Sequence, residues 1–512
     1  MGNFKKKMGA FFRGDKFSSS AVTALVLAVV IVANVALYAV CRLFNLYIHT
    51  TEKTDLSLSG STDAYFEEAI KKAKAENKKV TISFCLPEED ISIHKTGAFV
   101  YETAKYFEER YPEFIEVRYI DIISQRLDGG KGALVDLSKY KKDMRGKDTA
   151  IRTYSMIFEY GDSYRVVTDS YSGVGFADFY TLDSQQYSTS YNGEEVMAGL
   201  ISWVVSDEHK SAYFTQNHSE IVDIAFSNLL ACAGYYIDVV DLQRDDIPDE
   251  CDLLVISNPS ADFKKSRYGD AYYEIEKIEN YMQKGGNLYV ALDPYVSSLP
   301  NLEGLLSEYG IAMSTTEKDN GASVRNIVTD DRDSIQSDGM TIVADYAKTD
   351  LGERISKKVA SFSKGSVIVR DVGALELSGT AEPLLLSSSA SVLDAAGKVV
   401  DDKGSYAVAA VSSREEQTGA TSRVVVIPSV YIAVSDSLVS RGYVNKDFIF
   451  ATFEEFFGAG NMPYGCKDIV YNTDTLENLK MGTAKLYTAL IMLVPIAVSI
   501  VGAVVVIRRK NR

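Results

Sequence analysis

The sequence is poor in the residue types from which metal centres and disulfide frameworks are built. Its 512 residues include only five Cys, four His and one Trp, and no Cys-x-x-Cys or His-Glu-x-x-His occurs. Zinc sites need such ligands in clusters, so we expect no metal centre and no disulfide scaffold. Cys232 and Cys251 could form a single disulfide, and two free buried thiols are at least as compatible with their positions.

The motifs of nucleotide hydrolysis and of serine-type catalysis are also missing. A phosphate-binding loop needs Gly, Lys and Ser or Thr at fixed offsets, and neither residues 129–132 nor the pair Gly173 and Gly175 has that spacing. No Gly-x-Ser-x-Gly indicates a nucleophile elbow. We therefore expect no catalytic residue and no cofactor in this chain.

Positive charge is scarce in the middle of the chain. The whole sequence has 54 Lys and Arg against 70 Asp and Glu, a net charge of −16. Without the basic ends, residues 46–484 retain 43 basic and 69 acidic residues, a net charge of −26. So acidic a region repels a phosphate backbone, which excludes nucleic acid as the partner of this region.

Two long uncharged hydrophobic runs are present, at residues 21–40 and 487–507. Each would form a helix about 30 Å long, the thickness of a bilayer core. Basic residues precede the first run at 5–16 and follow the second at 508–512, and Lys and Arg stay on the cytoplasmic side. This pattern predicts a two-pass protein of the cell membrane with both termini cytoplasmic and the bulk of the chain extracytoplasmic. A cleaved signal peptide fits the first run less well, because the run is long and no small-x-small site follows it.

Between these runs, predicted strands alternate with predicted helices. A strand at 80–86, a helix at 96–110 and a strand at 114–123 form a β-α-β unit, and a second alternation begins near Lys210. The predicted fold class is α/β: a two-span membrane protein with two or more extracytoplasmic Rossmann-like domains built on parallel sheets. Such sheets bind ligands at the carboxyl ends of their strands. The expected organisation is a basic N-terminus (1–20), a transmembrane helix (21–41), a linker and helix (42–75), a first α/β domain (76–205), a doubly wound second domain (206–313), a β-rich segment completing it (314–460), a linker (461–485), a second transmembrane helix (486–507) and a basic tail (508–512).

The candidate site is the turn after the predicted strand at 211–215, formed by Gln216, Asn217, His218, Ser219 and Glu220. We predict that a helix follows from Ser219 to Ala233. His218 and Glu220 could form an acid–base pair, or the helix start could bind an anion or a partner's carboxylate through its N–H groups and dipole. In the purely structural alternative, Ser219 caps the helix and Glu220 interacts with its positive end.

The stretch AYFTQNHSE at residues 212–220 resembles the corresponding region of GldG-like proteins, which are auxiliary, gliding-motility-associated components of ABC-type transport systems. The family usually has Gly-His-Gly-Glu there, and this chain has Asn217 and Ser219 in place of the two glycines. Further similarities follow the family's order and cover nearly the whole chain: residues 54–59, 235–236, 247–248, 281–294, 302–310, 422–429 and 445–448.

The resemblance implies a non-enzymatic, membrane-anchored auxiliary subunit of an ABC-type transport complex. Its spans would contact the permease, a separate subunit would bind ATP, and the outer domains would bind an exported protein or a cell-envelope polymer. One alternative is a surface-anchored module that binds cell-wall glycan or peptide independently of a transporter, suggested by the 32 Tyr. Another is a membrane-tethered hydrolase that uses His218 and Glu220.

Overall fold

The computed structural model describes residues 56–470, with gaps at 95, 169–175, 183–187, 266–272, 318–322, 331–338, 389, 394–397, 439–441, 461 and 467. Leu56–Tyr471 form one compact unit. The hydrophobic runs at 21–40 and 487–507 lie outside the described residues. Within the described ranges, no helix is long and apolar enough to cross a membrane.

The N-terminal part contains a four-stranded sheet with the order β2-β1-β3-β4. β1 (Val80–Phe84) and β2 (Ile115–Asp121) pair in parallel and are joined by α6 (Gly97–Arg110), so the predicted β-α-β unit is confirmed. β3 (Met156–Tyr160) and β4 (Ser163–Val167) form an antiparallel hairpin. All five residues of β1 are buried, as expected for a central strand that is covered on both faces.

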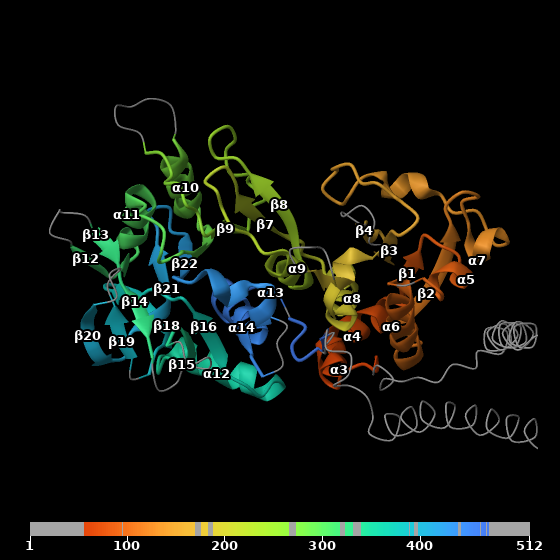
Figure 1. Cartoon of the computed structure of the whole chain (residues 1–512). Coiled ribbons are helices and arrows are strands. Elements are labelled where there is room, and N and C mark those ends of the chain that lie inside the picture. Colours follow the sequence, from red (N-terminus) through yellow and green to blue (C-terminus); the bar gives the residue numbers. More distant parts are fainter. Residues whose placement is uncertain are drawn as a thin grey trace, which may run out of the picture. The chain divides into compact units, whose positions relative to one another are not determined.

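An eleven-stranded mixed sheet organises the rest of the unit (Figure 1). Its parallel strands, in sheet order, are β8 (Tyr235–Val240), β7 (Lys210–Thr215), β9 (Leu253–Ser257), β10 (Asn287–Ala291) and β22 (Thr421–Ile427). In chain order this arrangement is 2-1-3-4-5, the order of flavodoxin-like doubly wound sheets. The sheet then continues with antiparallel strands: β21 (Ala407–Glu415), β18 (Ala381–Leu386), β15 (Thr341–Tyr346) and β16 (Val367–Arg370), with β17 (Leu375–Leu377) and β11 (Ile311–Met313) beside them.

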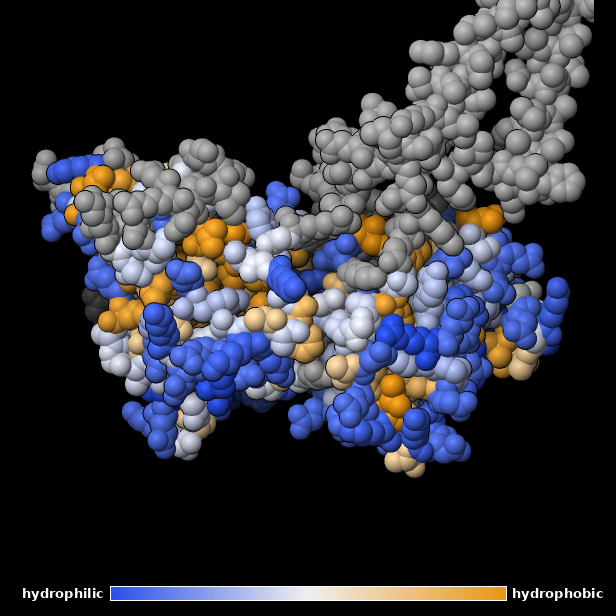
Figure 2. Space-filling model, turned by 90° about the horizontal axis from the view of Figure 1, so that it is seen from below, coloured by the Kyte–Doolittle hydropathy of each residue, from blue (hydrophilic) through white to orange (hydrophobic). Residues whose placement is uncertain are grey.

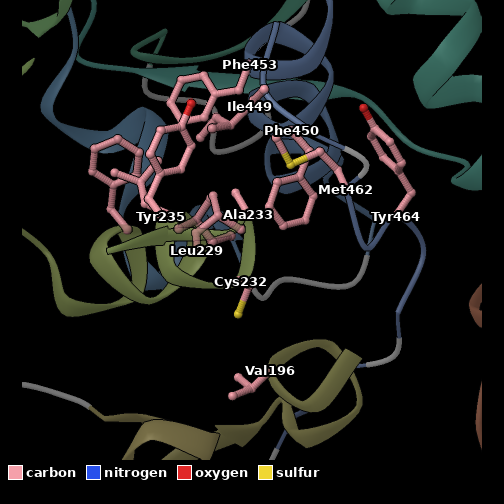
Figure 3. Close-up of a cluster of buried hydrophobic side chains, with 14 of the residues drawn as sticks. Val196, Leu229, Cys232, Ala233, Tyr235, Ile449, Phe450, Phe453, Met462 and Tyr464 are labelled. Atoms are coloured by element: carbon pink, nitrogen blue, oxygen red, sulfur yellow. The ribbon is translucent and has the colours of Figure 1, made fainter. Parts of the chain in front are cut away.

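Helices cover both faces of the parallel strands, because successive strand residues point to opposite sides. Phe214, Val255 and Tyr289 belong to the hydrophobic core that contains α9 (Ile224–Cys232) and α14 (Asn445–Phe457). Figure 3 shows this core, where Leu229 of α9 and Tyr235 of β8 lie near Phe450 and Phe453 of α14. The neighbouring residues Leu254, Ile256, Leu288 and Val290 belong to a second core, which contains α10 (Glu274–Gln283) and α11 (Pro300–Glu308).

Shorter elements complete the unit. The helices are α3 (Ser61–Tyr65), α4 (Glu67–Glu76), α5 (Glu88–Ile91), α7 (Leu127–Gly130), η1 (Leu137–Lys141), η2 (Ala177–Phe179), α8 (Gly193–Val205), α12 (Asp350–Phe362), η3 (Val430–Ala433) and α13 (Ser435–Leu438). The strands are β5 (Tyr180–Leu182), β6 (Ser188–Tyr191), β12 (Thr315–Glu317), β13 (Ser323–Arg325), β14 (Ile327–Thr329), β19 (Ala390–Leu393), β20 (Val399–Gly404) and β23 (Ile469–Val470). On the face shown in Figure 2, hydrophilic residues predominate and hydrophobic residues form small separate groups.

The two ends of the unit meet at α8. Near the beginning of the unit, Ser59 and Thr62 donate hydrogen bonds from their hydroxyls to Oε1 of Glu194, at 2.7 and 2.6 Å. Near its end, β23 pairs with β6, the strand that precedes α8. A Cβ built on Gly465 would lie 3.3 Å from Oγ of Ser61. The segments that lead into and out of the unit therefore lie side by side.

Gly199 allows α8 and α9 to pack closely. A Cβ at this position would lie 2.5 Å from the carbonyl oxygen of Cys232. We expect Gly199→Ala to lower the free energy of unfolding by about 1–3 kcal/mol, because the helices must separate to accommodate the methyl group. Urea denaturation of the full chain in mild detergent can be followed by the fluorescence of Trp203, the single tryptophan, which is buried on α8.

The matched control is Gly304→Ala on α11, where a Cβ has nothing within 4 Å. This change should leave the protein as stable or slightly more stable, since Ala favours a helix over Gly. Equal unfolding midpoints for wild type and Gly199→Ala would contradict the close packing of α8 on α9.

Candidate functional site

The predicted site lies at the switch point of the parallel sheet. From β7 the chain passes to β8 on one side, and from β8 it crosses to β9 on the other side of β7. The carboxyl ends of β7 and β9 therefore flank the crevice where doubly wound folds bind their ligands. The loop after β7, residues 216–223, and the loop after β9, residues 258–265, are bonded to each other. The amides of Ser260 and Ala261 donate to the carbonyl oxygen of His218, at 2.9 and 3.0 Å.

His218 is buried between two carboxylates, with only 1% of its surface exposed. Its Nδ1 lies 3.1 Å from Oε1 of Glu220, and its Nε2 lies 3.0 Å from Oε1 of Glu274. One face of the imidazole stacks on the ring of Phe263, with 3.9 Å between the ring centroids. Both ring nitrogens therefore have a carboxylate partner inside the protein.

The two carboxylates favour the charged imidazolium. Burial by itself lowers the pKa of His218, but the hydrogen bond with Glu220 and the negative charges of Glu274 and Glu220 outweigh burial and raise the pKa above its ordinary value. Burial raises the pKa of Glu220, whereas its bonds to the His218 ring and to backbone N–H groups outweigh burial and lower the pKa. The raised pKa of His218 and the lowered pKa of Glu220 both favour the charged forms, so the two side chains form a buried ion pair.

This group joins three elements of the fold. Glu220 also accepts a 2.7 Å hydrogen bond from the backbone N–H of His218, which holds the loop after β7 in a tight turn. Glu274, in the first turn of α10, accepts a 2.6 Å bond from the backbone N–H of Lys264 in the loop after β9. His218 therefore positions both loops and the start of α10, and it presents no unoccupied ring nitrogen for proton transfer with a substrate.

The five predicted residues separate into an inner and an outer set. His218 and Glu220 have buried side chains, whereas Gln216, Asn217 and Ser219 are exposed. These three and Glu220 line an open depression of about 710 Å³. Asn217 and Ser219 have φ of +78° and +56°, in the left-handed region that favours glycine.

The predicted start of the helix is wrong. α9 begins at Ile224, and its cap is Asp223, whose side chain accepts a 2.8 Å bond from the N–H of Ala225. The left-handed backbone at Ser219 is incompatible with a helix starting there. Ser219 is therefore not the cap, and Glu220 interacts with His218 instead of with the positive end of a helix. The N-terminus of α9 carries the Asp223 carboxylate, which also accepts a 2.9 Å bond from Ser435 Oγ.

Two members of the site could not be found from the sequence. Glu274 and Phe263 have no spacing or motif that distinguishes them from other acidic and aromatic residues of the chain. Their only sequence signal is a position after a predicted strand, at the carboxyl edge of the sheet. Glu274 is 56 residues away from His218 in the sequence, and the order of the strands brings the two side chains together.

The part of the chain that the structure describes contains neither a cluster of metal ligands nor a disulfide. No group of three His, Cys, Asp or Glu side chains there could hold a metal ion. Cys85, Cys232, Cys251 and Cys466 are buried free thiols, so Cys232 and Cys251 do not form a disulfide with each other. Burial raises the pKa of the Cys251 thiol to about 12, which leaves it protonated and unreactive at neutral pH.

Comparison with known proteins assigns the chain to no family. No protein-family model matches the chain, and no curated protein matches its sequence. The N-terminal domain of mmIFT52 is 16% identical, over 49% of this chain and 99% of that chain, with a TM-score of 0.35. A ThuA-like protein from Bacteroides uniformis is 11% identical, over 48% of this chain and 90% of that chain, with a TM-score of 0.28. A cytoplasmic protein from Salmonella typhimurium is 13% identical, over 48% and 98%, with a TM-score of 0.30. The strand order by itself makes the chain an α/β protein with a flavodoxin-like parallel core. Its distant likeness to IFT52 and ThuA-like domains assigns it to no family.

Proposed function

We propose that this protein is a membrane-anchored, non-enzymatic auxiliary subunit of an ABC-type transport complex. In this proposal the hydrophobic runs at 21–40 and 487–507 contact a permease, and a separate subunit binds ATP. The folded unit binds an exported protein or a cell-envelope component outside the cytoplasm. The resemblance to GldG-like proteins, which extends over nearly the whole sequence, supports this assignment.

The observation that carries the proposal is the meeting of both ends of the folded unit. A domain that is held at both ends by one membrane needs its two exits on the same side. Here the entering segment at Ser59–Thr62 and the leaving segment at Gly465–Val470 are both attached to α8 or to the strand before it. Close termini are common in globular domains, and in this chain a hydrophobic run also lies beyond each of them.

The geometry at the switch point supports a binding role over a hydrolytic one. His218, the candidate base, is buried and bonded at both ring nitrogens. Beside the exposed polar residues of the turn, three aliphatic side chains are also exposed: Ile221, Val222 and Val239 are 53%, 41% and 55% exposed. Exposed aliphatic side chains at the carboxyl edge of a sheet suit contact with another protein.

The alternative of a cell-wall glycan module finds less support. Its motivation is the abundance of tyrosine, which in sugar-binding proteins forms exposed aromatic faces. Tyr160, Tyr164, Tyr180 and Tyr191 are instead buried among the hydrophobic residues of the N-terminal part. Tyr154 is 36% exposed, but its ring packs against His94 and Phe176. We therefore do not propose glycan binding as a second function.

Affinity purification from the native membrane in mild detergent tests the proposal. We expect the tagged full chain to recover a multi-span permease and an ATP-binding subunit. The matched control replaces residues 21–40 by an unrelated hydrophobic helix, which keeps the anchor but removes the contact, so both subunits should be lost. Recovery of the wild-type chain alone, in a detergent that preserves other ABC complexes, would contradict the assignment. Labelling of either terminus in intact cells by a membrane-impermeant reagent would contradict the topology on which it depends.

A further inference from the structure

A second pocket, which shares the lining residues Ser227 and Ile237 with the depression at the switch point, contains a half-buried arginine that has no ion-pair partner among the described residues. It has a volume of about 360 Å³ and lies between β4 and α8 on one side and α9 and β8 on the other. Arg165 of β4 lines it, and Nη1 of Arg165 is buried with no hydrogen-bond partner. Among the described residues, the only hydrogen bond of this guanidinium is from Nη2 to the carbonyl oxygen of Tyr235, at 3.3 Å.

Aromatic rings hold the Arg165 guanidinium in place. Its central carbon lies 5.2 Å from the ring centroid of Trp203 and 5.4 Å from that of Tyr236. Cation–π contacts of this kind stabilise a guanidinium only partly, because a buried charge still requires hydrogen-bonded counter-charge. Burial lowers the pKa of Arg165 from its ordinary value.

The nearby charged groups do not neutralise Arg165. Asp143 also lines the pocket, but its carboxylate accepts two bonds from the guanidinium of Arg145, at 3.0 and 3.1 Å, and two from backbone N–H groups. Arg145 in turn stacks on Tyr236 and reaches Asp238. Asp178 lines the pocket and attracts Arg165 electrostatically, yet no ion pair joins the two. Arg165 is therefore the cation that remains for a ligand.

The rest of the lining defines the shape of that ligand. The walls are mixed, because the polar residues Thr149, Thr168, Ser227 and Asn228 line the pocket beside a group of aliphatic ones. Cys232 of α9 points toward Val196 of α8 (Figure 3). The aliphatic lining residues are Val166, Val167, Val196, Leu200, Ala231 and Ile237. Pockets that bind small molecules have volumes of roughly 300–1,000 Å³, so this one suits a molecule of amino-acid size.

We propose that this pocket binds a small aliphatic carboxylate, whose carboxylate pairs with Arg165 and whose hydrocarbon part packs between α8 and α9. A phosphate or nucleotide fits less well, since it carries more charge than one guanidinium can match and the pocket also contains Asp143 and Asp178. A bound ligand would contact β4 of the four-stranded sheet and β8 of the eleven-stranded sheet. It would therefore stabilise the packing of these two parts of the unit on each other. This site is independent of the proposed transport role.

Titration of the full chain in mild detergent tests the site, with the fluorescence of Trp203 as the readout because its ring contacts Arg165. The probes are isovalerate, leucine, isoamyl alcohol and inorganic phosphate. We expect isovalerate or leucine to bind saturably, and the alcohol, which has the same hydrocarbon part without a carboxylate, not to bind. Binding of leucine in preference to isovalerate would identify an amino acid as the natural class. Binding of phosphate alone, or of none of the probes, would overturn the proposal.

Two variants and a control make the test specific. Arg165→Gln should weaken carboxylate binding at least tenfold, as expected for loss of a charge-assisted hydrogen bond worth about 1.4 kcal/mol or more. Ala231→Leu should block binding by filling the pocket while it leaves Arg165 in place. Arg118→Gln, which removes an arginine paired with Glu116 on the surface of β2, should leave binding unchanged. Equal affinity in wild type and both pocket variants, measured by calorimetry, would overturn the assignment.

Discussion

Replacing Lys446 by methionine is expected to lower the free energy of unfolding by about 3–5 kcal/mol at pH 8, because it removes the cation of a buried ion-pair group. Lys446, on α14, forms ion pairs with Glu195 of α8 and with Asp468, whose Oδ2 lies 2.7 Å from Nζ. The side chains of Lys446, Glu195 and Asp468 are only 11%, 3% and 14% exposed. Removing the cation leaves two buried carboxylates without counter-charge. The helix α14 then loses its connection to α8 and to the end of the unit.

The pH dependence of this effect has a definite sign. Burial raises the pKa of Glu195 to about 7, although Lys446 opposes the rise, and burial also raises the pKa of Asp468. A carboxyl group whose pKa is raised in the folded state holds its proton more strongly in the folded than in the unfolded protein. Its contribution to stability therefore falls as the pH rises from the ordinary value of 4.5 toward 7 for Glu195. Without Lys446 these pKa values rise further, so the difference between wild type and Lys446→Met should be large at pH 8 and smaller at pH 5.5.

Urea denaturation followed by Trp203 fluorescence at both pH values measures the difference. Lys357→Met is the matched control, because Lys357 pairs with Glu353 on the exposed face of α12, where both side chains are more than half exposed. That change should alter the stability by no more than about 0.5 kcal/mol. Adding Glu195→Gln to Lys446→Met should recover part of the loss, since it removes one of the unpaired charges. An equal loss at both pH values would show that the carboxylates are not buried as charges.

His218→Ala is expected to lower the free energy of unfolding by about 3–5 kcal/mol near pH 6, because it leaves Glu220 and Glu274 buried without a cation. Because the pKa of His218 is raised in the folded protein, its contribution to the free energy of unfolding is complete below pH 6.5, the ordinary pKa. That contribution is lost as the pH rises through the pKa of the folded state. Because the pKa of Glu220 is lowered, its contribution to the free energy of unfolding is complete above pH 4.5, the ordinary pKa. That contribution is lost as the pH falls through the pKa of the folded state. The difference between wild type and variant should therefore be greatest between pH 4.5 and 6.5 and should shrink in alkali.

Hydrogen exchange can show which part of the structure His218→Ala destabilises. The amides of residues 216–223 and 258–265 should exchange faster in His218→Ala, because the histidine joins these two loops. His209→Ala is the control: that ring is half-buried, stacks on Trp203, and has no contact with either loop. Unchanged exchange in the two loops, together with an unchanged unfolding midpoint near pH 6, would show that the buried ion pair does not support the site.

The local elements could be predicted because their signals are local. The strand predicted at 80–86 is β1, Val80–Phe84, and the helix predicted at 96–110 is α6, Gly97–Arg110. Runs of apolar residues bounded by turn residues are sufficient for such assignments. The alternation after Lys210 likewise predicted parallel strands with helices on both faces, and β7, β9 and β10 have that arrangement. The start of α9 was mispredicted, since nothing local shows that Asn217 and Ser219 adopt left-handed backbone.

The sequence by itself determined the α/β class, the acidic middle region, the two hydrophobic runs and the position of the 216–220 turn at the carboxyl edge of a sheet. Only the tertiary structure decided which side chains meet there and elsewhere. Glu274 reaches His218 across 56 residues, and Glu195 reaches Lys446 across 251. The physical reason is that patterning acts through neighbours along the chain, whereas burial and charge pairing act through neighbours in space. Those neighbours are set by the order of the strands and by the antiparallel strands that extend the parallel core.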